Sequence, residues 1–395
     1  MIIFIVLTLT EILTPVALRQ HFYSRSKPVF YIAAIAHLIL STWLWMLFVR
    51  ITSFRGFYDT PENVWNIMQF TGMMVAVVFP RSILVILHFY GKIRRYGTGG
   101  HINRLTNTGL IIATSVFLII AFSTLHGRFN FHTEEVEIRI KGLHEDLDGL
   151  KIVHLSDLHL AGFYHHNNVL YEQMKEINKL DPGLLLNTGD FVTFGWREYG
   201  RNDTILSIAR AGYGNFAVPG NHDFGTYHPH FTEADRKNNV LKINQLVKSS
   251  GYQILNDENV TIRIKDAKVA LIGITTMGSH PDIVHGNMAK ALNGIDSVDL
   301  KILLSHDPNH WTKEVAGKTD IDLTLVGHTH GMQMGIYTRN FRWSPSKYFY
   351  PHWGGLFSEG EQYLYVNLGL GVLSIPFRIW MPPEITLITL KREDI

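Results

Sequence analysis

The sequence predicts a chain of two parts, an N-terminal region of four transmembrane helices followed by a C-terminal α/β domain. Long apolar stretches are confined to the first third of the 395 residues. Charge is divided in the same way, because residues 1–127 contain ten Lys and Arg against three Asp and Glu, whereas the remainder contains 26 against 31. From residue 128 on, short β-rich segments alternate with amphipathic segments and turns, which is typical of α/β proteins. We therefore expect domains at 1–127 and 128–395.

Each of four apolar stretches approaches or exceeds the roughly 20 residues that a helix needs to cross a bilayer core about 30 Å thick. A cleaved signal peptide is the alternative interpretation of the first stretch, but no basic residue precedes it and no small-residue cleavage site follows it. We therefore expect an integral protein of the cell membrane with four spanning helices. The stretches cover residues 2–18, 29–49, 66–90 and 107–125.

The short loops predict the orientation of these helices. Basic residues follow the first stretch and lie between the third and fourth, whereas the loop between the second and third has balanced charge. Because loops rich in Lys and Arg stay in the cytoplasm, both termini and the α/β domain are expected on the extracytoplasmic side. The basic loop residues are Arg19, Arg25, Lys27, Lys92, Arg94, Arg95 and Arg104.

Two ionisable residues, Glu11 and Arg81, fall inside the apolar stretches. Both are costly in a bilayer unless they are paired. Counted from the basic loops, both lie roughly 12 to 16 Å from the cytoplasmic ends at ~1.5 Å per residue. They are therefore at the right depth for an intramembrane ion pair, and the alternative is that each faces a polar environment independently.

In the second part, the spacing of apolar residues predicts alternating strands and helices. Strands are expected at 150–155, 183–188 and 213–218, and helices at 168–180, 202–211 and 231–249. Further strands are expected near 252–255, 260–264, 268–274, 300–304, 322–326, 363–367 and 385–390.

Polar side chains follow five of the predicted strands at the point where each strand ends. This is where α/β sheets build their sites. The chain has no cysteine, so a metal site must use carboxylate, imidazole or amide groups. One such motif alone is more often a turn, but five in succession predict a metal centre. The motifs are Asp157-Leu158-His159, Gly189-Asp190, Gly220-Asn221-His222-Asp223, His306-Asp307 and Gly327-His328-Thr329-His330.

The ordered set D-x-H, G-D, G-N-H-D, H and G-H-x-H resembles the calcineurin-like metallophosphoesterases over residues 150–335. The chain also resembles the membrane-anchored bacterial subgroup, the transmembrane proteins with a metallophosphoesterase domain, in Gly331-Met332-Gln333, Asn367-Leu368-Gly369-Leu370-Gly371, Arg378 and Pro383-Glu384-Ile385. The resemblance implies an α/β domain of two β-sheets between helices, with a site for two divalent metal ions. It implies that Asp157, His159 and His330 bind the first metal, that Asn221, His306 and His328 bind the second, and that Asp190 bridges both.

The resemblance also implies a mechanism, in which a metal-bridging hydroxide attacks phosphorus and His222 assists the leaving group. Asp223 is expected to orient the His222 ring, with a simple turn residue as the alternative. Met332 replaces a glycine that the subgroup often has, which bears on substrate fit. The aromatic segment 341–355 either rests at the lipid interface or covers a sheet edge. Further candidates for substrate contact, with packing as the alternative, are His165, His166, Arg197, His228, His230, His280 and His285.

The chain is therefore expected to be a metal-dependent phosphoric ester hydrolase. Its cofactors are expected to be two divalent ions, with Mn, Zn and Fe all suited to these ligands. The expected substrate is a phosphate ester or pyrophosphate, lipid-linked because the anchor holds the domain at the membrane, and no nucleic-acid partner is expected. The alternative is a catalytically inactive metal-binding domain that serves as a membrane sensor or scaffold; the intact ligand positions argue against it.

Overall fold

The computed structural model describes residues 2–53, 57–98, 102–275, 286–338 and 341–393. It divides into two compact units, each of which is described by itself. Phe57–Trp65 belongs to the second unit although it lies between apolar stretches in the sequence. The helical unit comprises Met1–Gly56, Asn66–His126 and Ser374–Phe377, and the α/β unit comprises Phe57–Trp65, Gly127–Leu373 and Arg378–Ile395.

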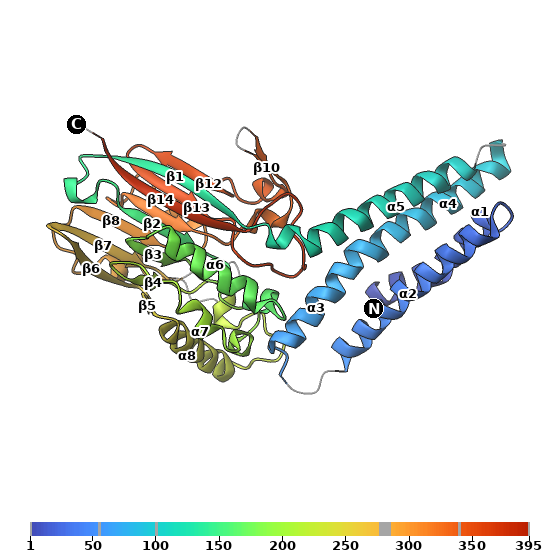
Figure 1. Ribbon diagram of the computed structural model, residues 1–395, viewed down its shortest axis with the longest axis horizontal. Helices are drawn as coiled ribbons and strands as arrows, with labels where there is room; N and C mark the ends of the chain where they lie inside the picture. The colour runs from blue at the N-terminus through green and yellow to red at the C-terminus, as the bar shows by residue number, and fades with distance from the viewer. Residues whose placement is uncertain (1, 54–56, 99–101, 276–285, 339–340, 394–395) are drawn as a thin grey trace. The chain divides into compact units, whose positions relative to one another are not determined.

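Long helices form the N-terminal part of the described chain (Figure 1). A π-helical turn, Met74–Val78, joins α3 to α4, so the two form one nearly continuous helix. On α2, the apolar side chains of Ile32, Leu38 and Met46 are exposed, as expected for a helix that faces lipid. The helices are α1 (Ile2–Phe22), α2 (Lys27–Thr52), α3 (Pro61–Met73), α4 (Phe79–Thr98) and α5 (Ile102–Leu125).

Within the described residues, three helical segments are long and apolar enough to cross a membrane. They are Lys27–Thr52, Pro61–Arg94 and Arg104–Phe129. The expected count of four is corrected here to three. The first apolar stretch does form helix α1, but α1 contains Glu11, Pro15 and Arg19, which reduce its apolar character.

Glu11 and Arg81, the charged residues that fall inside the apolar stretches, are paired with each other. Arg81 Nη1 lies 3.1 Å from Glu11 Oε1, and it donates a hydrogen bond of 3.1 Å to Ser41 Oγ. A further bond of 3.3 Å joins Arg81 Nη2 to the carbonyl oxygen of His37. The pairing that the sequence allowed is therefore confirmed, and the two charges compensate each other within the helix bundle.

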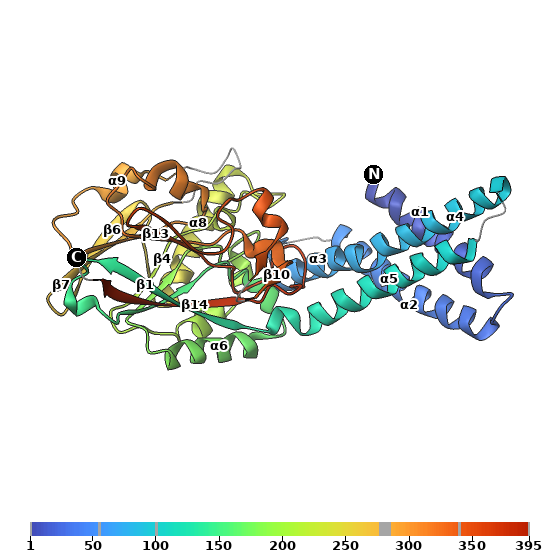
Figure 2. The same ribbon diagram turned by 90° about the horizontal axis from the view of Figure 1, so that it is seen from above.

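The α/β unit contains two mixed six-stranded sheets, ordered β1-β14-β2-β3-β4-β5 and β12-β13-β9-β8-β7-β6. The central strands β2 to β5 are mutually parallel, as are β7, β8, β9 and β13. In Figure 2 the long strands β1 and β14 run side by side. The strands are β1 (His132–Lys141), β2 (Lys151–Leu155), β3 (Leu184–Asn187), β4 (Asn215–Ala217), β5 (Tyr252–Ile254), β6 (Glu258–Ile264), β7 (Ala267–Gly273), β8 (Leu300–Leu304), β9 (Leu323–Val326), β12 (Gly355–Glu359), β13 (Gln362–Val366) and β14 (Glu384–Glu393), with a separate pair β10 (Ile336–Tyr337) and β11 (Arg342–Trp343).

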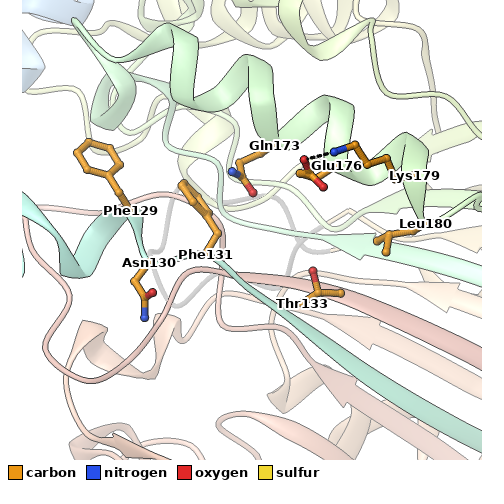
Figure 3. Close-up of a pocket in the computed structure, with 8 residues that line it drawn as sticks. All are labelled: Phe129, Asn130, Phe131, Thr133, Gln173, Glu176, Lys179 and Leu180. Atoms are coloured by element: carbon orange, nitrogen blue, oxygen red, sulfur yellow. Dashed lines mark hydrogen bonds and ion pairs between the residues drawn. The ribbon is translucent and has the colours of Figure 1, made fainter.

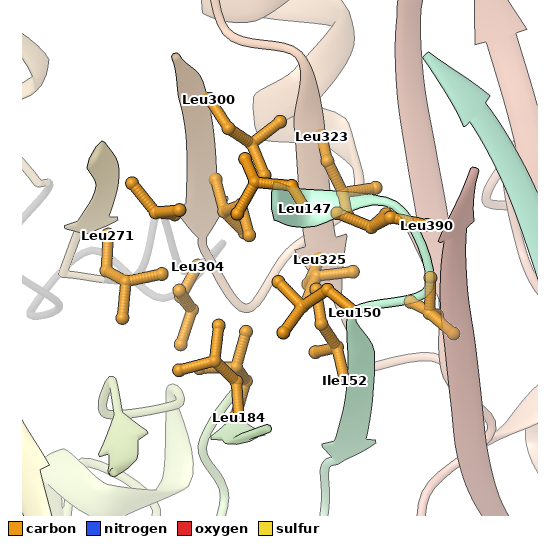
Figure 4. Packing of buried hydrophobic residues seen from close by; sticks show 14 of the residues in the cluster. Leu147, Leu150, Ile152, Leu184, Leu271, Leu300, Leu304, Leu323, Leu325 and Leu390 are labelled. Atoms are coloured by element: carbon orange, nitrogen blue, oxygen red, sulfur yellow. The ribbon is translucent and has the colours of Figure 1, made fainter. Parts of the chain in front are cut away.

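The main core lies between the two sheets. Figure 4 shows Ile152 and Leu184 of the first sheet together with Leu271, Leu304 and Leu325 of the second, and all five are fully buried. Each such side chain contributes roughly 1.5–3 kcal/mol relative to an exposed one. Helices pack on the outer faces, which confirms the expected arrangement of two sheets between helices. These helices are α6 (Asn167–Lys179), α7 (Asn202–Leu206), α8 (Glu233–Ser249) and α9 (Met288–Leu292).

Candidate metal centre

Loops at the carboxyl ends of β2, β3, β4, β8 and β9 carry all seven predicted metal ligands. Because β2, β3 and β4 are parallel to one another, as are β8 and β9, the carboxyl ends of the strands in each set lie on the same side of their sheet. The structure brings the seven side chains together as two adjoining groups, and their burial ranges from complete to partial. They are Asp157 and His159 after β2, Asp190 after β3, Asn221 after β4, His306 after β8, and His328 and His330 after β9.

The first group consists of Asp157, His159 and His330. One potential ligand atom from each lies within 4.8 Å of the others. Nε2 of His330 is 3.1 Å from Asp157 Oδ1 and 3.1 Å from Nε2 of His159. The three side chains therefore point at a common centre, as the resemblance implied.

The second group consists of Asp190, His306 and His328, again within 4.8 Å of one another. Asn221 joins it, since its Oδ1 lies 2.9 Å from Nδ1 of His328. Asp190 Oδ2 is 3.1 Å from Nε2 of His306 and 3.7 Å from Nε2 of His159. Asp190 thus contacts imidazoles of both groups, which is the position that a bridging ligand requires.

The electrostatics of the site favour added positive charge. Although burial raises it, the pKa of Asp157 is held well below its usual range by the nearby imidazoles, His330 foremost. Burial lowers the pKa of His306, but Asp190 and Asp157 raise it to about 10. Buried carboxylates that hold a proton on a neighbouring imidazole are suited to hold a metal cation in its place.

The hydrogen bonding of the group also fits metal ions. Asp157 Oδ1 and His306 Nε2 are buried and, among the described residues, have no hydrogen-bond partner, although each has an ion-pair neighbour at 3.1 Å. Buried polar atoms are normally satisfied, so such atoms need another partner. Carboxylate, imidazole and amide donors suit Mn, Fe and Zn. The residues present therefore fit two divalent cations.

The backbone at the site is held in an uncommon conformation. Five of the seven residues have a left-handed φ, which is unusual for residues other than glycine and is concentrated at functional sites. The values are 53° for Asp157, 39° for His159, 57° for Asp190, 73° for His328 and 49° for His330. The tight turns place successive side chains toward the same centre.

Close approach of two loops requires a glycine at position 327. A Cβ added to Gly327 would lie 1.9 Å from Ser156 Oγ and 2.3 Å from Asp157 Oδ2. The loops after β2 and β9 can therefore meet only if position 327 has no side chain. This close approach lets the backbone N–H of His328 donate a hydrogen bond of 2.9 Å to Asp157 Oδ2.

The two predicted catalytic residues occupy different environments. His222 Nδ1 lies 2.7 Å from the carbonyl oxygen of Thr193, and its backbone N–H donates to Asp190 Oδ1 at 2.9 Å. The Asp223 carboxylate instead accepts from the backbone N–H groups of Gly220, Asp190, Phe191 and Val192. In this geometry the Asp223 carboxylate links two loops, whereas the His222 ring is hydrogen-bonded to the backbone of Thr193 and stacks on the ring of Tyr227 at 4.3 Å.

Neighbouring groups determine which imidazole nitrogen faces the centre. His306 Nδ1 donates to the carbonyl oxygen of Thr188 at 2.7 Å, and His159 Nδ1 lies 3.2 Å from Thr193 Oγ1. Such partners orient metal-binding histidines. Sequence reasoning did not find them, because nothing in the pattern distinguishes these two threonines from other turn residues.

Two tyrosines also adjoin the second group. Tyr350 Oη lies 2.8 Å from His328 Nε2, and Tyr227 Oη accepts from Asn221 Nδ2 at 3.0 Å. Burial raises the pKa of Tyr350 to about 12, so its phenol stays protonated. Tyr350 belongs to the aromatic segment 341–355, which therefore borders the site, while its neighbours Tyr348 and Phe349 are exposed. Neither tyrosine was singled out from the sequence.

The remaining candidates are dispersed. His166 packs against Phe129, and His228 and Arg197 approach Asp59. Met332 is exposed and lies two residues after His330 of the first group. Candidates His280 and His285 lie outside the described residues.

A pocket of about 360 Å³ lies elsewhere on the α/β unit, between the start of β1 and helix α6 (Figure 3). None of the seven predicted ligands lines it. Its walls are formed by Phe129, Asn130, Phe131, Thr133, Gln173, Glu176, Lys179 and Leu180.

Comparison with known proteins gives matches across both parts of the chain. The family model for calcineurin-like phosphoesterases matches residues 150–332. An uncharacterized metallophosphoesterase of Campylobacter jejuni is 30% identical over 320 residues, which cover 81% of this chain and 77% of that protein. A transmembrane protein with metallophosphoesterase domain from Danio rerio is 27% identical over a stretch that covers 85% of this chain and 75% of that protein. UDP-2,3-diacylglucosamine pyrophosphatase LpxG of Chlamydia muridarum is 27% identical over a stretch that covers 61% of this chain and 83% of that protein.

Proposed function

This chain belongs to the calcineurin-like phosphoesterase family, and we propose that it uses two divalent metal ions to hydrolyse a phosphate ester or pyrophosphate group on a membrane lipid. The observation that carries the proposal is the geometry of Asp190. Its carboxylate contacts His306 of one potential metal group and His159 of the other. Adjacent cations need a shared anion between them, and Asp190 would supply it.

Each of the seven ligand residues is assigned to one ion or to both. Asp157, His159 and His330 would hold one ion, Asn221, His306 and His328 would hold the other, and Asp190 would contact both. When bound, the two ions supply Lewis acidity that activates water and neutralises the charge of the phosphoryl oxygens.

His222 supports the departure of the leaving group. Its Nδ1–H donates a hydrogen bond to the Thr193 carbonyl oxygen, so the proton of the neutral ring is held on Nδ1. Nε2 is therefore the atom that can transfer a proton to the leaving oxygen. A positioned acid of this kind contributes about 10²- to 10⁴-fold to the rate.

The membrane segments support a lipid-borne substrate. The domain is tethered to a helical unit with three candidate spans, so a substrate in the same bilayer is reached by diffusion in two dimensions. The pyrophosphatase LpxG, similar to this chain, is named for a diacylated sugar nucleotide.

The loop charges support an extracytoplasmic location for the site. Lys92, Arg94 and Arg104 lie at the junction of the second and third candidate spans, which favours the cytoplasm for that junction. The segment that follows the third span is then on the opposite side. This conclusion does not depend on whether α1 crosses the membrane.

The substrate class can be tested with matched pairs of phosphates. Full-length protein in detergent micelles containing Mn²⁺ would be given phosphatidic acid or glycerol 3-phosphate, which share the same phosphate monoester. We expect a higher kcat/KM for the lipid, and loss of both activities in Asp190→Asn. Equal or greater activity on the soluble ester would contradict the lipid-borne substrate while leaving the hydrolase intact.

A further inference from the structure

A short segment that joins two membrane-spanning stretches, Phe57–Trp65, is built into the α/β unit. Its centre is Asp59, whose side chain is completely buried. A buried carboxylate is costly unless it is paired and hydrogen-bonded. Its partners are therefore informative about what the segment does.

Asp59 binds the loop that follows β3. Arg197 Nη1 contacts both carboxylate oxygens of Asp59, at 3.1 and 3.3 Å, and the backbone N–H of Arg197 lies 3.4 Å from Oδ2. Gly195 makes room for this contact, because a Cβ there would lie 2.4 Å from Asp59 Oδ2. The Asp59 carboxylate thus matches this loop in both charge and shape.

Aromatic side chains reinforce the same contact. The Arg197 guanidinium lies 3.6 Å from the ring centre of Phe57, and Tyr58 packs edge-on against Phe194 at 5.1 Å. Tyr58 also meets the ring of His228 at 5.5 Å. Phe57, Tyr58 and Asp59 therefore all contact the loop that follows β3.

That loop is closed by hydrogen bonds to one of its own side chains. The buried carboxylate of Glu198 accepts hydrogen bonds from the backbone N–H groups of Thr193 (2.8 Å), Phe194 and Gly195 (3.1 Å). Residues 193–198 consequently form one hydrogen-bonded turn, which we call the 193–198 turn. Arg197 and Thr193 therefore belong to one hydrogen-bonded unit.

Thr193 connects the turn to the metal centre. Its carbonyl oxygen lies 2.7 Å from Nδ1 of His222, and its Oγ1 lies 3.2 Å from Nδ1 of His159. The chain of contacts from Asp59 to His222 is therefore continuous: Asp59 to Arg197, through the turn to Thr193, and then to the ring.

We propose that Asp59, in the segment between two membrane-spanning stretches, is a positioning residue that holds the 193–198 turn so that Thr193 orients His222 toward the leaving group. The inference rests on the proposed hydrolase function and goes beyond it. It makes the segment between two membrane-spanning stretches a contributor to catalysis.

The test compares Asp59→Asn with wild type as full-length proteins in detergent at saturating Mn²⁺. Asn keeps the shape of Asp but loses the charge that holds Arg197. Two diesters separate positioning from general damage: bis-p-nitrophenyl phosphate releases a good leaving group that needs little protonation, whereas diphenyl phosphate releases a poor one. Glu172→Gln is the matched control, because Glu172 pairs with Lys175 on the exposed face of α6, away from the site.

We expect kcat of Asp59→Asn for diphenyl phosphate to fall about 10- to 100-fold, as for a catalytic group displaced by about 1 Å. The fall for bis-p-nitrophenyl phosphate should be several-fold smaller, with KM unchanged for both. Arg197→Gln, which removes the other partner at a partly exposed position, should show the same pattern and covers the case that Asp59→Asn does not fold.

Other outcomes would overturn the inference. Equal losses on both diesters, or an activity within twofold of wild type, would show that the segment does not position His222. If wild type itself cleaves neither diester, the proposed function fails first, so the two failures are distinguishable. Glu172→Gln should match wild type throughout.

Discussion

Replacing Gly327 by Ala should disrupt the metal centre at a single, defined contact. The added methyl carbon would lie 1.9 Å from Ser156 Oγ and 2.3 Å from Asp157 Oδ2. Ordinary contact starts near 3.4 Å, so the loops must separate by about 1.5 Å at the first of these atoms. Asp157 is a predicted ligand, and it moves with Ser156.

The expected effects follow from that displacement. Overpacking of this kind costs about 1–3 kcal/mol of stability. A displacement of roughly 1 Å in catalytic geometry can lower activity about 100-fold. We therefore expect Gly327→Ala to remain folded with a lower Tm, to bind less than two Mn²⁺ per chain, and to lose most of its activity.

The assay measures Tm, Mn²⁺ per chain by mass spectrometry, and hydrolysis of bis-p-nitrophenyl phosphate. Gly212→Ala is the control, because a Cβ there meets only the Pro182 carbonyl oxygen at 4.0 Å. If Gly327→Ala retained full metal content and activity within twofold of wild type, the close approach of the two loops would not matter and the reasoning would be refuted.

Three further predictions concern other parts of the chain. Burial lowers the pKa of His154 to about 3 from 6.5, although Asp157 raises it, so below pH 6.5 the unfolded chain binds a proton that the folded chain does not. The free energy of unfolding should therefore fall by up to roughly 1.4 kcal/mol per pH unit as pH drops from 6.5. His154→Gln should flatten that slope in urea titrations, and an unchanged slope would exclude His154 as its source. Glu11→Gln should lower stability in detergent by roughly 3–5 kcal/mol because Arg81 loses its charged partner, and adding Arg81→Met should restore much of it; no restoration would argue against the pair. Tyr350→Phe should weaken Mn²⁺ binding about tenfold with little change in Tm, and unaltered affinity measured by calorimetry would show that its contact with His328 does not tune the site.

The sequence predicted the α/β unit and the gathering of the seven ligand positions because each follows an apolar strand. The carboxyl ends of parallel strands meet, so Asp157, Asp190 and Asn221 had to approach one another once the strands were placed. Depth alone allowed the pairing of Glu11 and Arg81 without deciding it, and the structure shows both the pair and the Ser41 contact that completes it. Whether the seven residues bind metal stays a prediction.

Other features depended on contacts between distant segments. Asp59 lies 138 residues from Arg197, and in the sequence it was only one acid in a balanced loop. The structure assigns the Asp223 carboxylate to backbone amides, which favours its role as a turn residue over the orientation of His222. The first apolar stretch is helical, but its Glu11 and Pro15 make composition a poor guide to whether it spans the membrane.

The measurement that tests the central claim most directly is Mn²⁺-dependent hydrolysis of bis-p-nitrophenyl phosphate by full-length wild type and Asp190→Asn, with bound metal counted in both. We predict two Mn²⁺ per wild-type chain and turnover that disappears when metal is removed and returns when it is restored. Asp190→Asn should bind less metal and show at least about 100-fold lower activity, since it lacks the shared anion. Two tightly bound ions without turnover, or an Asp190→Asn variant as active as wild type, would contradict the account.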